Sequence, residues 1–310
     1  MFLGASSWVF SWAPPYEEAI KTISRLGLKG VELTIWNEEF MNDYYTEEKN
    51  KELKQLIADE GLVLTNVFCL PGSQSSPDRE VRLKGLENFK KAVSIAKQLG
   101  TSQLTTCVTC PFELQFPFEQ LRPTTQTWTL DVPKGLDWKQ NYADFIETMK
   151  LYAEVCEKND VRLSIEPHPH FYIKNAEGLL RMTEKVGSDR IGINFDPSHL
   201  FPMGEIPQVA VYQMQDHIMH THFSDNDAQS NAHWRPGKGK IDWDATVRAL
   251  DDIGYNGVIS LELEDVPGAA GFPGFHRDPN SNAELIEKEY RLAIEYMEKV
   301  FEREGIELEK

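Results

Sequence analysis

Four side chains of the kinds that bind metal ions stand at the ends of four short apolar runs in the second half of the chain. They are Glu166, Asp196, His222 and Glu262, and the gaps between them are 30, 26 and 40 residues. One strand and its helix occupy roughly 31 residues in an eight-unit barrel, which is close to this spacing. Three carboxylates and one imidazole form an oxygen-rich set that suits one Mn²⁺, Mg²⁺ or Co²⁺ ion. A single residue of this kind is usually a solvated loop residue, but four at consecutive strand ends predict a metal site.

The stretch around Asp196 is the clearest of these units. Apolar residues alternate from Ile191 to Phe195 in the manner of a short strand, and Asp196 and Pro197 end it with a carboxylate at the exit. His199 follows three residues later, so it can fold back beside that carboxylate.

Strand and helix patterns alternate along the whole sequence. Apolar runs predict strands at residues 2–7, 29–35, 62–68, 103–110, 161–166, 191–196, 218–222 and 257–264. Helical periodicity with capping residues predicts helices at residues 16–26, 46–60, 78–99, 138–159, 176–186, 242–253 and 283–301. This alternation has no linker, so we expect residues 1–310 to form one α/β domain. The fold class is a (β/α)8 TIM barrel, with its active site at the carboxyl ends of the strands.

One long irregular segment, residues 111–136, interrupts the alternation after the fourth strand. It carries several prolines and four aromatic residues, Phe112, Phe116, Phe118 and Trp128. Loops of this length are usually functional or mobile, and this one follows the carboxyl end of a strand. Two interpretations stay open: a lid or wall over a substrate pocket, and a contact between subunits.

The composition excludes several classes of protein. The chain has 310 residues, with 32 Lys and Arg against 49 Asp and Glu, which gives a formal charge of -17. Nucleic-acid binding needs clustered basic residues, so this charge argues against it. No segment is apolar for long enough to cross a bilayer, and the N-terminus does not read as a signal peptide. The four cysteines are too few for a disulfide framework, and we expect a cytoplasmic protein with reduced thiols.

The ligand series resembles a known family. The Glu, Asp-x-x-His, His-x-His and Glu pattern, with Pro-Gly-Lys-Gly-Lys-Ile-Asp-Trp at residues 236–243, resembles the xylose-isomerase-like sugar isomerases and epimerases. Gly-Tyr-Asn-Gly at residues 254–257 adds a similarity to the ketose 3-epimerase branch. The resemblance implies one divalent ion held by Glu166, Asp196, His222 and Glu262. It also implies a small sugar or polyol substrate and, often, a homo-oligomer.

The resemblance further implies a reaction. A metal that chelates a carbonyl and the neighbouring hydroxyl acidifies the carbon between them and stabilises the enediolate that forms when the proton leaves. Glu166 and Glu262 take the acid and base roles on opposite faces of that carbon. The resemblance implies that His199 binds the substrate carbonyl or a hydroxyl, as the histidine of the Asp-x-x-His motif does in the epimerases. A hydrogen bond from His199 to Asp196 is the structural alternative.

Three further residues are weaker candidates for substrate binding. Arg235 resembles the substrate-binding arginine of the epimerases, although the loop that carries it is longer here. His168 follows Glu166 where the epimerases have other residues, which indicates a different substrate. Trp8 is a candidate for stacking on a sugar ring, with core packing as the alternative.

Three rival functions are left open. Dehydratases and enzymes that cleave C-glycosides share this fold and use a metal to abstract a proton beside a carbonyl. Endonuclease IV shares Asp196-x-x-His199 and His233, but its histidines on strands three and four are absent, and Asn231 stands where it has an aspartate. A barrel used only as a scaffold needs no inward-facing carboxylates, so an intact ligand set argues against it.

Overall fold

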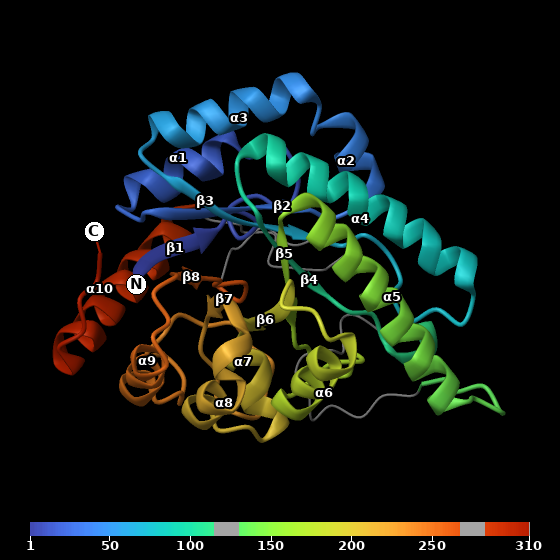
Figure 1. Ribbon diagram of the computed structural model, residues 1–310. Helices are drawn as coiled ribbons and strands as arrows, with labels where there is room; N and C mark the ends of the chain where they lie inside the picture. Colours follow the sequence, from blue (N-terminus) through green and yellow to red (C-terminus); the bar gives the residue numbers. More distant parts are fainter. Residues whose placement is uncertain (115–129, 267–282, 310) are drawn as a thin grey trace.

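Eight parallel strands pair in chain order and close into a barrel, because β8 pairs with β1 (Figure 1). The computed structural model describes residues 1–114, 130–266 and 283–309. The strands are β1 (Phe2–Ser6), β2 (Gly30–Ile35), β3 (Val63–Cys69), β4 (Gln103–Cys107), β5 (Arg162–Glu166), β6 (Ile191–Phe195), β7 (Ile218–Phe223) and β8 (Val258–Leu261). The predicted (β/α)8 TIM barrel is confirmed.

Helices surround the barrel (Figure 1). Their buried apolar residues belong to the same core cluster as those of the strands. The predicted helices are α1 (Glu17–Arg25), α3 (Glu47–Asp59), α4 (Arg79–Leu99), α5 (Trp138–Asn159), α6 (Ala176–Val186), α9 (Trp243–Asp252) and α10 (Ala283–Glu304). Local signals set their ends: the Asp78 side chain accepts from the Glu80 amide at the start of α4, and Gly100 has a φ of 101° at its end. For this reason most predicted boundaries lie within a few residues of the observed ones.

Three short helices were not predicted: α2 (Glu38–Asp43), α7 (Pro197–Leu200) and α8 (Pro207–Met214). In α8, Val209 and Tyr212 are exposed while Ala210 and Val211 are buried. Apolar residues therefore lie on both sides of the helix, and the sequence has no one-sided periodicity to reveal it.

The fourth strand is shorter than predicted, because it ends at Cys107 and not at Cys110. The next residues bond to the loop after β3 and leave the strand ladder. The Thr109 amide donates to Gln74 Oε1 at 3.2 Å, and the Ser75 hydroxyl donates to the Cys110 carbonyl at 2.6 Å. Residues 115–129 lie outside the described residues. The two interpretations of this loop, a lid and a subunit contact, therefore both stay predictions.

The barrel interior below the carboxyl-terminal rim is polar. The fully buried side chains that meet there across the strands are Glu32, Asn66, Asn194, His220 and Ser260. Barrels of this kind usually fill this space with branched apolar residues. Polar groups in such a place need hydrogen-bond partners, so the interior is built around specific contacts.

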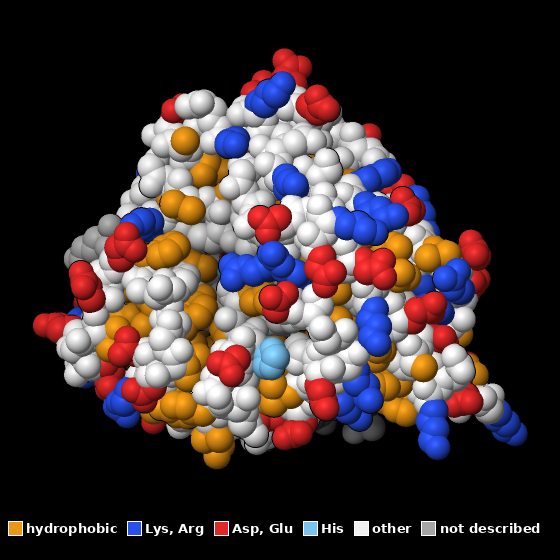
Figure 2. All heavy atoms as spheres, in the orientation of Figure 1, with side chains coloured by type: hydrophobic (Ala, Val, Ile, Leu, Met, Phe, Trp, Pro, Cys, Tyr) orange, Lys and Arg blue, Asp and Glu red, His pale blue; other side chains and the backbone are white. Residues whose placement is uncertain are grey.

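The surface of the molecule carries both signs of charge. Acidic and basic side chains are interspersed over the face that Figure 2 shows. None of the described helices has both the length and the apolar character needed to cross a membrane.

Candidate metal centre

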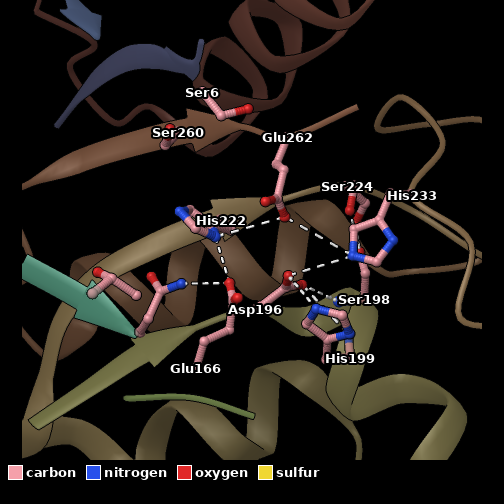
Figure 3. Close-up of polar contacts among 12 residues, drawn as sticks. Ser6, Glu166, Asp196, Ser198, His199, His222, Ser224, His233, Ser260 and Glu262 are labelled. Carbon is pink, nitrogen blue, oxygen red and sulfur yellow. Dashed lines mark hydrogen bonds and ion pairs between the residues drawn. The ribbon is translucent and has the colours of Figure 1, made fainter. Parts of the chain in front are cut away.

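The four predicted ligands meet at the carboxyl-terminal rim of the barrel, where their side chains point toward one another (Figure 3). One ligand atom from each of Glu166, Asp196, His222 and Glu262 lies within 4.8 Å of the others. Glu166 ends β5, Asp196 caps α7 directly after β6, His222 lies in β7, and Glu262 follows β8. Four consecutive strand ends thus supply one side chain each.

The donor set fits a divalent cation. The three carboxylates are 0 to 4% exposed, so their charges have little water to screen them. Asp196 Oδ1 accepts from the amides of Ser198 and His199 at 2.7 and 3.4 Å, whereas its buried Oδ2 has no hydrogen-bond partner among the described residues. Burial, together with the charge of Glu166, raises the pKa of Glu262 well above its usual range. A divalent ion would supply the positive charge that this buried cluster needs.

A carboxylate outside the ligand set contacts the imidazole of His222. Its Nε2 donates to Glu32 Oε2 at 3.0 Å, while its Nδ1 faces Glu166 and lies 3.6 Å from Glu262 Oε2. Although burial opposes it, the charges of Glu32, Glu262 and Glu166 raise the pKa of His222 well above its usual value. The sequence interpretation gave Glu32 no role. The signal that could have found it is a carboxylate in the middle of the apolar strand β2.

A second group of ligand atoms adjoins the first and shares Asp196. Its Oδ2 lies 3.6 Å from His199 Nε2 and 3.7 Å from His233 Nε2. His199 Nδ1 lies 2.8 Å from Asn231 Oδ1, to which it donates, so its Nε2 presents a lone pair to the site. This group could hold a cation or bind substrate oxygens. The sequence analysis considered His233 only as a match to a rival family.

His168 lies beside the ligand cluster. Its Nε2 is 3.7 Å from Glu166 Oε2, and its ring centroid is 3.9 Å from that of His199. The side chain keeps 22% exposure, and burial lowers its pKa. A neutral imidazole in this place can both donate to and accept from a hydroxyl group.

The other two substrate-binding candidates have different surroundings. Trp8 is 1% exposed, and its indole Nε1 donates to Glu262 Oε1 at 3.1 Å. It therefore contacts a proposed metal ligand. Arg235 pairs with Glu289 of α10, with Nε 3.2 Å from Oε2. The structure therefore brings His199 and His168 to the centre, places Trp8 against it, and turns Arg235 toward the outer helix.

Comparison with known proteins agrees with this fold. Residues 20–300 match the family described as the xylose isomerase-like TIM barrel. The chain belongs to this family.

Two named proteins are similar over most of the chain. Hydroxypyruvate isomerase of Escherichia coli (strain K12) is 28% identical over 261 residues, which are 78% of this chain and 84% of that protein. D-psicose 3-epimerase from Clostridium cellulolyticum H10, solved with D-tagatose, superposes with a TM-score of 0.76 at 20% identity and covers 97% of this chain and 99% of its own. An uncharacterised protein of Methanocaldococcus jannaschii is 30% identical over 166 residues, 52% of each chain. The named relatives are thus a sugar epimerase and an isomerase.

In this xylose isomerase-like barrel, the motif at residues 236–243 folds around a buried carboxylate. Asp225 accepts from the amides of Gly237 and Ile241 at 2.9 and 3.1 Å and from Trp243 Nε1 at 3.0 Å. A Cβ on Gly239 would clash with Asp225 Oδ1, so glycine is needed there. The motif therefore shapes the loop after β7, and this loop carries His233 to the site.

Proposed function

We propose that the protein is a divalent-metal-dependent sugar isomerase or epimerase that moves a proton on the carbon beside a ketose carbonyl. One observation carries the proposal: Glu166 and Glu262 approach the ligand cluster from opposite sides (Figure 3). A carboxylate on each face of one carbon can remove a proton from one side and return it to the other. Exchange of a proton between two faces inverts the carbon, which is epimerisation.

The chain prepares each of these two carboxylates for proton transfer. Asn194 Nδ2 donates to Glu166 Oε1 at 2.7 Å, and Trp8 holds Glu262 Oε1, so one oxygen of each group is fixed. A divalent ion held by Glu166, Asp196, His222 and Glu262 would polarise the carbonyl and stabilise the enediolate charge. Mn²⁺, Mg²⁺ and Co²⁺ all suit this donor set.

We assign substrate binding to the histidines beside the cluster. His199 presents Nε2 toward the site, and the partly exposed His168 ring lies tilted against it. Neutral His199 can accept a hydrogen bond from a sugar hydroxyl at Nε2, and neutral His168 can donate or accept. Arg235 takes no part in this proposal, because its guanidinium pairs with Glu289.

Solvent exchange tests the proposal directly. The protein loaded with Mn²⁺ or Co²⁺ is incubated in D₂O with a panel of free ketoses, and deuterium entry is followed by NMR after removal of the ion. Entry at C3 supports epimerisation, and entry at C1 supports aldose-ketose isomerisation. The same protein with EDTA is the control. Absence of exchange in every sugar, with metal bound, would contradict the proposal, and loss of water from a keto-polyol would then identify a dehydratase.

A further inference from the structure

A ring of buried polar side chains lies below the four ligands, joined by hydrogen bonds at every step but the last. It runs from Glu32 to His222, then to Glu166, Asn194 and His220, and returns to Glu32. All five side chains are 2% exposed or less. Two members of the ring are ligands in the proposed metal site, and three contact only other protein groups in the described part of the chain.

One side of the ring sets the orientation of His222. Glu32 Oε2 accepts from His222 Nε2 at 3.0 Å and from Asn66 Nδ2 at 2.6 Å, and Ser260 donates to Oε1. The carboxylate is thus fixed by donors from β3 and β8. With its Nε2 proton given to Glu32, the imidazole must present Nδ1 to the ligand cluster.

The other side of the ring sets the orientation of Glu166. His220 Nδ1 lies 3.0 Å from Asn194 Oδ1, and only the ring nitrogen can donate in that pair. The amide of Asn194 therefore turns its Nδ2 toward Glu166 Oε1, at 2.7 Å. His220 Nε2 lies 3.8 Å from Glu32 Oε2 without a hydrogen bond, so the two sides of the ring are close to each other at this point but not bonded.

We propose that Glu32, Asn194 and His220 are positioning residues that hold His222 and Glu166 in ligand geometry before a cation binds. Glu32 comes from β2 and His222 from β7, so the ring crosses the barrel. Burial of these groups costs free energy that branched apolar side chains would not cost. Their presence in the barrel interior is explained when they fix the rotamers of two ligands. The inference depends on the metal site of the proposed function.

Titration calorimetry with Co²⁺ on the purified protein tests the ring. Glu32→Gln and His220→Ala should each weaken Co²⁺ affinity by about 10 to 100-fold, the usual effect of losing a group behind a metal ligand. His220→Asn should keep an affinity near wild type, because its side-chain NH₂ reaches the place of Nδ1. Ser164→Ala is the matched control, since Ser164 is equally buried and bonds to Thr105 and Gln103, outside the ring.

An NMR measurement keeps the test independent of variants that fail to fold. In the wild-type protein loaded with diamagnetic Zn²⁺, the Nε2 proton of His222 should exchange slowly with solvent, because Glu32 accepts it in a buried place. Unchanged Co²⁺ affinity in Glu32→Gln and His220→Ala would overturn the positioning role of the ring, and so would a proton on Nδ1 of His222. Neither result would contradict the proposed function. Failure of the wild-type protein to bind any of the ions would overturn both.

Discussion

Each carboxylate of the metal centre has one oxygen fixed by a donor from the protein. Trp8 holds Oε1 of Glu262, Asn194 holds Oε1 of Glu166, and the Ser198 amide holds Oδ1 of Asp196. The second oxygens of Glu262 and Asp196 face the histidines of the cluster, whereas Glu166 presents to His222 the same oxygen that Asn194 holds. Fixing one oxygen removes rotamer freedom before binding, so less conformational entropy is lost when a cation or substrate arrives.

Glu262→Gln isolates the proton-transfer role of one residue. The variant keeps the size of the side chain and an acceptor for Trp8, so we expect an unfolding midpoint close to wild type. A glutamine cannot take up the substrate proton, so deuterium exchange should be lost for the epimer whose C3 proton faces Glu262, while Glu166 can still exchange the proton of the other epimer. Thermal unfolding and the D₂O assay measure these two effects. Exchange at the wild-type rate would remove the acid-base assignment of Glu262.

The loop between β7 and α9 depends on one buried carboxylate. Asp225 is 0% exposed and accepts two amide hydrogens and one indole hydrogen, as described above. Without it, the buried Ile241 amide and the buried Trp243 indole would lack a partner, and each unsatisfied buried donor costs about 1 to 3 kcal/mol. The element therefore owes its shape to an internal contact and not to regular secondary structure.

Asp225→Ala should lower the free energy of unfolding by about 2 kcal/mol or more, because the Ile241 amide and the Trp243 indole remain buried without an acceptor. Asp227→Ala is a matched control in the same loop. Asp227 Oδ1 also accepts three hydrogen bonds, from the amides of Gln229 and Ser230 and from the Ser230 hydroxyl, but it is only partly buried. Urea unfolding of the two variants compares them, and equal losses would contradict the importance of burial.

The whole barrel should gain stability from metal, because the four ligands come from four different strands. We expect binding of one Mn²⁺ or Co²⁺ per chain and a rise of about 2.7 kcal/mol in unfolding free energy when free metal is 100 times Kd. EDTA should reverse the gain, and Asp196→Ala should abolish it. Native mass spectrometry gives the stoichiometry. Two ions per chain would show that the group of Asp196, His199 and His233 also binds metal.

Acid should destabilise the metal-free protein through Glu32. Burial alone would raise its pKa, but the charges of His222 and His220 and the hydrogen bonds of His222 and Asn66 lower it to about 2. The unfolded chain binds this proton near pH 4.5, so the stabilisation is complete above that pH and is lost as pH falls toward 2. In urea unfolding between pH 6 and 3, the free energy of unfolding should fall more steeply with pH in the wild type than in Glu32→Gln. The same dependence on pH in both proteins would contradict the contribution of Glu32.

The order of strands and helices was predictable because the signals for it are local. Apolar runs, the cap at Asp78 and the glycine at Gly100 each act over a few residues. The helix α8 escaped prediction, because a short helix with apolar residues on both sides leaves no such signal. The early end of β4 also could not be predicted from local signals. The last residues of the predicted strand bond to a loop 35 residues away in sequence.

The sequence by itself determined the barrel and the convergence of its four ligands, since parallel strands must place their carboxyl ends at one rim. The tertiary structure decided what stands behind those ligands. His222 meets Glu32 across 190 residues, and Trp8 meets Glu262 across 254. Such contacts arise only when the barrel closes and non-neighbouring strands share one interior. The direction of Arg235, which the loop and α10 set together, depends on packing in the same way.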